Sequence, residues 1–296
     1  MRTLLLLLLV SLTNIGFAQD EYINYAQGNE SYHQFKVGAT SYLLADNVNV
    51  REKPSSKGAI VANLPIGTAV KIIKVSNEKL RLNGFKTNWY KVSFEAENNV
   101  SSGYVWGGLI AEGTVRGVDS KVLFLYGIAS VKKEDKGDYT SEEGIIQVRA
   151  CKNHQELSKI KLKSASNYLN IHHWLGNYGN KGLNNVVDIL EFGESAESCG
   201  GVNACNVIFW DGKNLTLAKT LYPGSDAPAY ASDRLIFPSD KGGEKGKIIG
   251  DQEEGWYSQD QEKDIVEYRK QVEYIWTGTT LQQTKVLLDK KYDVRE

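Results

Sequence analysis

The sequence predicts an all-β protein in two parts, a small barrel followed by a larger β-rich domain. Short runs in which apolar and polar residues alternate recur along most of the chain, and a period of two is typical of strands. Nearly every gap between these runs holds Gly, Pro, Asn, Asp or Ser, the residues of turns. The chain also has 28 Gly, 16 Tyr and 6 Trp but a single Met, which favours β-structure.

The first 18 residues form a separate segment. Met1 and Arg2 precede an unbroken leucine run, and the small residues Gly16 and Ala18 follow it. The apolar run is too short to span a membrane, so the pattern predicts a secretory signal peptide cleaved after Ala18, with a buried N-terminal helix as the alternative. We therefore expect an exported protein, periplasmic or extracellular, whose mature length is typical of two domains.

The charges of the chain argue against some classes of partner. Lys and Arg number 35 and Asp and Glu number 36, and there is no basic block. A chain this close to neutral is a poor candidate for binding nucleic acid or an anionic membrane surface. No further run is long and apolar enough to span a bilayer.

Residues 41–112 are expected to form the barrel, after an N-terminal segment at 19–40. The pattern predicts strands at 42–50, 59–64, 69–75, 89–94 and 103–106. In the first strand Val48 and Val50 share the inward face, and Asn49 and Arg51 share the outer face. Pro54 and the serines after it end this strand at a turn.

The order and spacing of motifs over these residues resemble the bacterial SH3 domain. The residues that carry the resemblance are Val48-Asn49-Val50-Arg51, Pro54-Ser55, Gly67, Trp89-Tyr90-Lys91-Val92, Gly103-Tyr104-Val105 and Leu109. The connections at 75–89 and 95–102 are longer and more polar than in the family's compact form. The resemblance implies a non-catalytic barrel that binds cell-wall peptide or a protein segment in the envelope.

Four side chains are candidate ligand contacts on this barrel. They are Arg51, Tyr90, Tyr104 and Trp106. Each has a structural alternative, as a residue that packs the barrel or supports a turn. Residues 41–112 contain no His, no Cys and no paired carboxylates with an evident role, so we expect binding without catalysis from this part.

A polar break at 113–120 is expected to link the barrel to a β-rich domain of unknown function at 121–296. Strands are predicted at 122–131, 144–152, 157–162, 168–174, 186–192, 207–210, 215–220, 234–237, 247–250, 266–276 and 281–288. The charged residues 132–143 are expected to form a solvated loop. A sandwich, an open sheet and a partial propeller all fit this pattern.

A weak internal repeat occurs in this second part at an offset of 66 residues. The repeated residues are Trp210, Gly212 and Leu215, then Trp276, Gly278 and Leu281. The repeating unit is a hairpin, and Asp211-Gly212 is typical of a two-residue turn. Chance similarity between two hairpins is the alternative.

Residues 177–217 also faintly resemble one blade of an integrin-type β-propeller. Asparagines stand where the aspartates of a calcium loop would be needed, and a hard cation prefers charged oxygen ligands. His172 and His173 are adjacent on a predicted strand and point to opposite faces, so they cannot readily share a metal. We expect no metal and no other cofactor.

The chain has three cysteines. Cys199 and Cys205 flank a short Gly-rich loop, and in an oxidising compartment we predict a disulfide between them. Cys151 would then be a buried small apolar residue, or it would take one of the other two as its partner. No His follows Cys199 or Cys205 in the sequence, which disfavours a thiol peptidase.

These patterns together predict an exported, non-catalytic envelope protein. The barrel would bind cell-wall peptide or an envelope protein segment, and the β-rich domain would supply a second recognition surface or a scaffold. One alternative is an envelope hydrolase with a carboxylate pair such as Glu142-Glu143, Asp251 with Glu253-Glu254, or Asp260 with Glu262. Another is an inhibitor or immunity-type protein that blocks a partner in the envelope.

Overall fold

The computed structural model describes residues 34–96, 99–118, 122–138, 140–166, 169, 171–195 and 203–293. These residues are almost entirely in β-strands, and a short 3-10 segment, η1 (Gly107–Leu109), is the helical turn that they contain. The all-β class predicted from the sequence is confirmed. No helix within the described ranges is long and apolar enough to cross a membrane.

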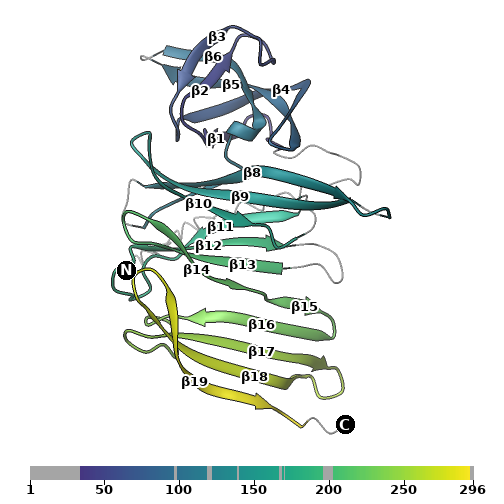
Figure 1. Ribbon diagram of the computed structural model, residues 1–296, viewed down its shortest axis with the longest axis vertical. Helices are drawn as coiled ribbons and strands as arrows, with labels where there is room; N and C mark the ends of the chain where they lie inside the picture. Colours follow the sequence, from purple (N-terminus) through teal and green to yellow (C-terminus); the bar gives the residue numbers. More distant parts are fainter. Residues whose placement is uncertain are drawn as a thin grey trace, which may run out of the picture.

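The first sheet is a small six-stranded barrel, which lies at one end of the molecule (Figure 1). Its strands are β1 (Thr40–Tyr42), β2 (Val48–Arg51), β3 (Ile60–Leu64), β4 (Ala69–Leu82), β5 (Phe85–Ala96) and β6 (Asn99–Trp106), in the spatial order β1-β4-β5-β6-β2-β3. Val48 and Val50 are buried in the barrel core, as their alternation predicts. The strand expected at 42–50 is split, because residues 43–47 connect β1 to β2.

Three antiparallel meanders follow the barrel along the chain and are stacked one below another in Figure 1. The first meander contains β7 (Gly113–Arg116), β8 (Leu123–Asp135), β9 (Thr140–Lys152) and β10 (Gln155–Lys163). The second contains β11 (His172–Asn177), β12 (Asp188–Ser195), β13 (Asn203–Trp210) and β14 (Leu215–Leu221). The third contains β15 (Gly224–Asp226), β16 (Ala229–Ile236), β17 (Ile248–Ser258), β18 (Lys263–Trp276) and β19 (Leu281–Lys291).

Apolar side chains fill the spaces between these layers. One cluster joins the barrel to the first and second meanders and includes Trp89, Trp106, Phe124 and Trp210. A second cluster lies between the second and third meanders and is centred on Phe209, whose ring packs edge-on against Trp276 at 4.8 Å between centroids. Burial of aromatic rings on this scale is a dominant stabilising term. Neighbouring layers therefore share a hydrophobic core, and each layer is not a separately packed unit.

The barrel and the first meander also touch through their backbones. The N–H of Val131 on β8 donates to the carbonyl of Asn83, in the turn between β4 and β5. Gly84 follows Asn83 with a φ of +85°, and a β-carbon there would overlap the backbone of Val131. A glycine is needed at this turn both for its conformation and for the close approach of the two sheets.

Two segments predicted to lack regular structure contain strands. Residues 113–116, expected to belong to a linker, form β7 and pair with β8. Residues 132–143, expected to be a solvated loop, are exposed over 132–138, as predicted, but the segment extends the β8–β9 hairpin to Asp135 and Thr140, so the prediction of a loop is wrong. A cross-strand ion pair contributes to this extension, in which Lys133 lies opposite Glu142 with 2.8 Å between nitrogen and oxygen. Opposite charges placed across a ladder stabilise a strand pair that has no apolar face.

The internal repeat corresponds to two hairpins of the same form. Trp210 pairs with Leu215 and Trp276 pairs with Leu281 as the first residues of each ladder. Gly212 and Gly278 have φ values of +97° and +99°. Four residues connect the strands in each hairpin, not the two expected from the turn signal, and a side-chain oxygen of the first loop residue accepts backbone N–H bonds in both.

Candidate functional site

A row of cationic and aromatic side chains crosses the outer face of the barrel. Arg51 on β2 pairs directly with Tyr104 on β6, Tyr104 pairs with Lys91 on β5, and Lys91 pairs with Lys74 on β4. Residues paired across strands hold their β-carbons about 5 Å apart. These four side chains, named here the cationic row, form a continuous strip with an aromatic ring between two cations.

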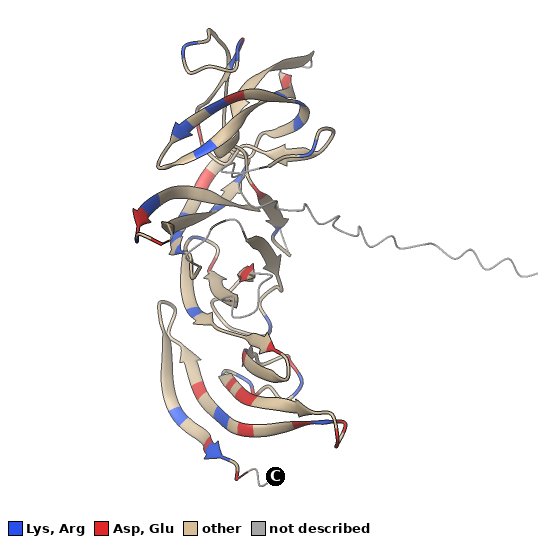
Figure 2. Cartoon of the chain, turned by 90° about the vertical axis from the view of Figure 1, so that its right-hand side faces the viewer, with Lys and Arg blue, Asp and Glu red and all other residues tan. Residues whose placement is uncertain are grey.

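The charges of the row are not balanced by neighbours. Lys74 is exposed and Lys91 half-buried, and neither makes an ion pair or a side-chain hydrogen bond to any residue that the structure describes. Like charges directly opposite on a ladder are destabilising. Residues 46–111 carry nine Lys or Arg against five Asp or Glu, and Figure 2 shows the Lys and Arg segments spread over the barrel strands. The row is therefore a surface that would be stabilised by an anionic ligand.

Arg51 has a structural contact as well as a place in the row. Its guanidinium donates a 2.7 Å hydrogen bond to the carbonyl of Gly58, at the far side of the connection between β2 and β3. A guanidinium has five donors, so one bond to the backbone leaves others for a carboxylate. The side chain thus fixes its own loop and is held in place for a ligand at the same time.

Two of the four predicted contacts are buried. Tyr90 is 2% exposed and lies in the barrel core, where its ring packs edge-on against Phe35 and burial raises its pKa. Trp106 is 3% exposed and points from the barrel toward the first meander, with its indole Nε1 donating to the carbonyl of Leu80 at 3.0 Å. The structure brings Arg51 and Tyr104 together and places the other two side chains in packing contacts.

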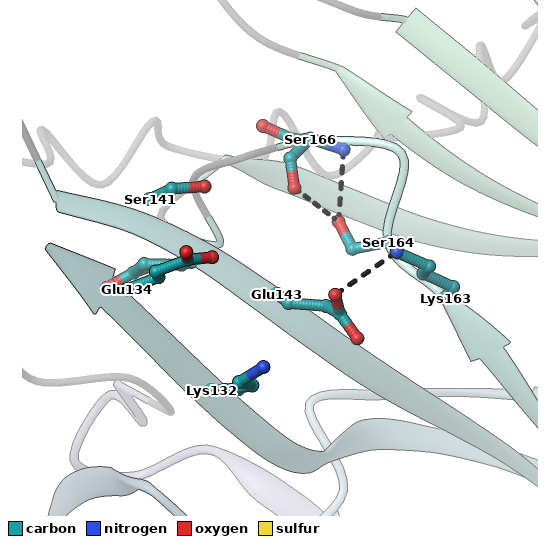
Figure 3. Close-up of a pocket in the computed structure, with 8 residues that line it drawn as sticks. Lys132, Glu134, Ser141, Glu143, Lys163, Ser164 and Ser166 are labelled. Atoms are coloured by element: carbon teal, nitrogen blue, oxygen red, sulfur yellow. Dashed lines mark hydrogen bonds and ion pairs between the residues drawn. The ribbon is translucent and has the colours of Figure 1, made fainter. Parts of the chain in front are cut away.

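The carboxylate pair Glu142-Glu143, considered for a hydrolase, lies at a small polar cavity on the first meander (Figure 3). Glu142 is bound by the ammonium of Lys133 and by the N–H of Leu169. Glu143 faces Lys163 at 3.2 Å. Both residues line this cavity, and each carboxylate has a cation of its own. The pair therefore lacks the arrangement of a glycosidase, in which two carboxylates flank one scissile bond.

Asp251, the second carboxylate considered, is 2% exposed and sits between two arginines. Arg234 and Arg269 donate to it at 2.7 and 3.1 Å, and Gln271 donates at 3.0 Å. Burial raises the pKa of Asp251, but these donors outweigh burial and leave the pKa below its usual value. Such a carboxylate stays ionised and paired, a poor proton donor. Of the third pair, Asp260 and Glu262 are exposed on the turn between β17 and β18.

A buried polar cluster that the sequence does not indicate lies between the first and second meanders. The imidazole of His173 has Glu112 on one side, at 3.8 Å from Nδ1, and Glu194 on the other, at 3.6 Å from Nε2. Ser164 donates to Glu194 at 2.6 Å, and the N–H of Ala165 donates at 2.9 Å. The serine hydroxyl meets the carboxylate rather than the imidazole, so the order of a catalytic triad is not present.

His172 and His173 point to opposite faces of β11, as predicted. His172 is exposed and His173 lies in the cluster just described. Among the residues that the structure describes, no group of three or more His, Cys, Asp and Glu could hold a metal ion.

The cysteines are described only in part. Cys151 is buried, as predicted, between the barrel and the first meander, and burial raises the pKa of its thiol. Cys205 has a free thiol in this structure, and burial with the nearby carboxylates raises its pKa to about 12. Cys199 lies outside the described residues, so its disulfide with Cys205 stays a prediction.

Comparison with known proteins gives a family match for one part of the chain. Residues 46–111 match the family model described as the bacterial SH3 domain. Neither the curated proteins nor the solved structures contain a match to this chain. The matched range begins just before β2 and ends after η1, and it contains every residue of the cationic row. Residues 46–111 are therefore a bacterial SH3 domain, carried on three stacked β-meanders.

Proposed function

We propose that this chain is exported to the bacterial envelope and binds cell-wall peptide through the cationic row of its SH3 domain, without catalysis. The observation that carries the proposal is the unpaired Lys74 and Lys91, opposite each other on the barrel surface beside Tyr104. Wall peptides are rich in carboxylates, which two ammonium groups and a guanidinium can bind. Bacterial SH3 domains are generally binding modules of envelope proteins, which supports the same assignment.

The ion pairs made by the candidate catalytic carboxylates favour binding without catalysis. Each of Glu142, Glu143 and Asp251 is matched with a cation on the same sheet, so a hydrolase would have to break ion pairs to use them. Export is supported by the leucine-rich pattern of residues 1–18. The first and second meanders share a core with the barrel, as a scaffold would.

The test is retention of the mature chain, residues 19–296, on purified peptidoglycan. The whole mature chain is used because Trp89 and Trp106 of the barrel share a core with Phe124 of the first meander. Charge reversal by Lys91→Glu or Lys74→Glu should abolish retention. Lys213→Glu, the same charge change at an exposed site on the second meander, should retain the wild-type level. Retention no higher than that of bovine albumin, or equal in all variants, would overturn the proposal.

A further inference from the structure

A second surface with the character of a ligand site lies on the second meander, away from the barrel. His172 and Trp174 alternate on β11 and share one face. Their rings are nearly parallel, with 21° between the planes and 5.9 Å between the centroids. Trp174 is 36% exposed, which is high for a tryptophan in a sheet. The two stacked rings form an exposed aromatic surface on the edge strand of this sheet.

A glycine beneath the tryptophan sets the orientation of this surface. Gly193 on β12 is paired directly with Trp174. A β-carbon at Gly193 would overlap the six-membered ring of the indole. The indole therefore lies against the bare backbone of β12, and its exposed part is on the side away from the sheet. A ring supported in this way is held before any ligand arrives.

Hydrogen-bonding groups flank the aromatic surface. Glu191 stands two residues from Gly193 on the same face of β12, diagonal to Trp174. Burial raises the pKa of the Glu191 carboxyl, which also accepts a bond from the hydroxyl of Tyr178. Tyr178 is 47% exposed and borders a shallow open depression that Lys181 also lines. Perturbed groups beside a depression and exposed rings are a combination typical of binding sites.

We propose that this surface binds a neutral polysaccharide by stacking one pyranose ring on Trp174. A pyranose has an apolar face of C–H groups and a rim of hydroxyls. The negative face of an aromatic ring attracts positively polarised C–H groups, and the carboxyl of Glu191 and the phenol of Tyr178 can bond the hydroxyls. An acidic peptide fits less well, because the carboxyl of Glu191 lies on the same face of the sheet, diagonal to Trp174. This site is separate from the cationic row and does not rest on the function proposed for it.

Isothermal titration of the mature chain with chitohexaose and with cellohexaose, both uncharged, tests the proposal. We expect saturable binding of at least one of these, with a quench of tryptophan fluorescence. Trp174→Ala should weaken binding by about tenfold or more. Gly193→Ala should weaken it similarly while leaving Trp174 in the chain, because the β-carbon displaces the indole. Tyr257→Ala removes another exposed ring, 46% exposed on the third meander, and should bind like the wild type.

The outcomes separate this site from the barrel site. Circular dichroism and urea unfolding establish that each variant is folded before titration. Absence of binding to both hexasaccharides by the wild-type chain would overturn the proposal, as would unchanged affinity of folded Trp174→Ala. The charge reversals Lys91→Glu and Lys74→Glu should leave hexasaccharide affinity unchanged, so failure of one site does not decide the other.

Discussion

The Nε2 atom of His173 lies 3.6 Å from Oε1 of Glu194, and both side chains are buried between the first and second meanders. The distance is too long for a hydrogen bond and short enough for an ion pair. Glu112 lies on the other side of the ring, at the start of the chain's passage from the barrel to the first meander. One imidazole thus faces carboxylates from two parts of the fold.

The pH dependence of stability should reveal the charge on Glu194. Burial raises its pKa, but His173 and the bonds from Ala165 and Ser164 outweigh burial and leave the pKa below its usual value. A lowered carboxyl pKa contributes stability above the unfolded pKa of about 4.3, and this contribution is lost as pH falls through the folded pKa.

Glu194→Gln should therefore lower the free energy of unfolding at pH 7 by about 1 to 3 kcal/mol, and the difference from the wild type should shrink on going to pH 3.5. Urea unfolding at both pH values measures it. Glu143→Gln, whose ion pair with Lys163 is exposed, should have an effect of less than about 1 kcal/mol. A Glu194→Gln difference that stays constant with pH would contradict the ionised state assigned to Glu194.

Binding through the cationic row should depend on salt. Lys74, Lys91 and Arg51 are at the surface, where ionic strength screens charge within about 10 Å at 0.1 M. Retention of the mature chain on peptidoglycan should fall steadily as NaCl is raised from about 50 mM to about 500 mM, while the unfolding curve changes little. Retention that does not vary over this range would indicate that packing rather than charge holds the ligand.

Trp106 and Tyr104, two positions apart on β6, should separate stability from binding. Trp106→Ala removes a ring from the core shared by the barrel and the first meander and should cost about 3 to 5 kcal/mol. Tyr104→Ala should cost less and weaken retention on peptidoglycan, because its ring is half-buried in the cationic row. Thermal unfolding followed by pulldown measures both. If Trp106→Ala kept wild-type stability but lost retention, the result would contradict the packing role and indicate that Trp106 contacts the ligand.

Alternation along the strands predicts most of the fold, and long-range contacts account for what it misses. Val48 and Val50 can be assigned to the inward face from the sequence, because residues two apart on one strand share a face. The same rule assigns Trp106 to the outer face, where it does lie, but cannot show that another sheet covers that face. The cluster around His173 joins residues that the sequence separates widely, Glu112 and Ser164 among them, and no local motif connects them. Of the cationic row, the family motif indicates Arg51 and Tyr104, whereas Lys74 and Lys91 become their neighbours only through strand register.

The repeated hairpins should respond alike to the same substitution. Gly212 and Gly278 have φ values of +97° and +99°, a conformation that a residue with a β-carbon adopts at a cost. Gly212→Ala and Gly278→Ala should each lower the free energy of unfolding by about 1 to 2 kcal/mol. Gly224→Ala is the matched control, because Gly224 has no positive φ and open space around it, and its effect should stay within about 0.5 kcal/mol. Urea unfolding measures all three, and unequal costs at Gly212 and Gly278 would show that the two hairpins are alike in form but not in their contribution to the fold.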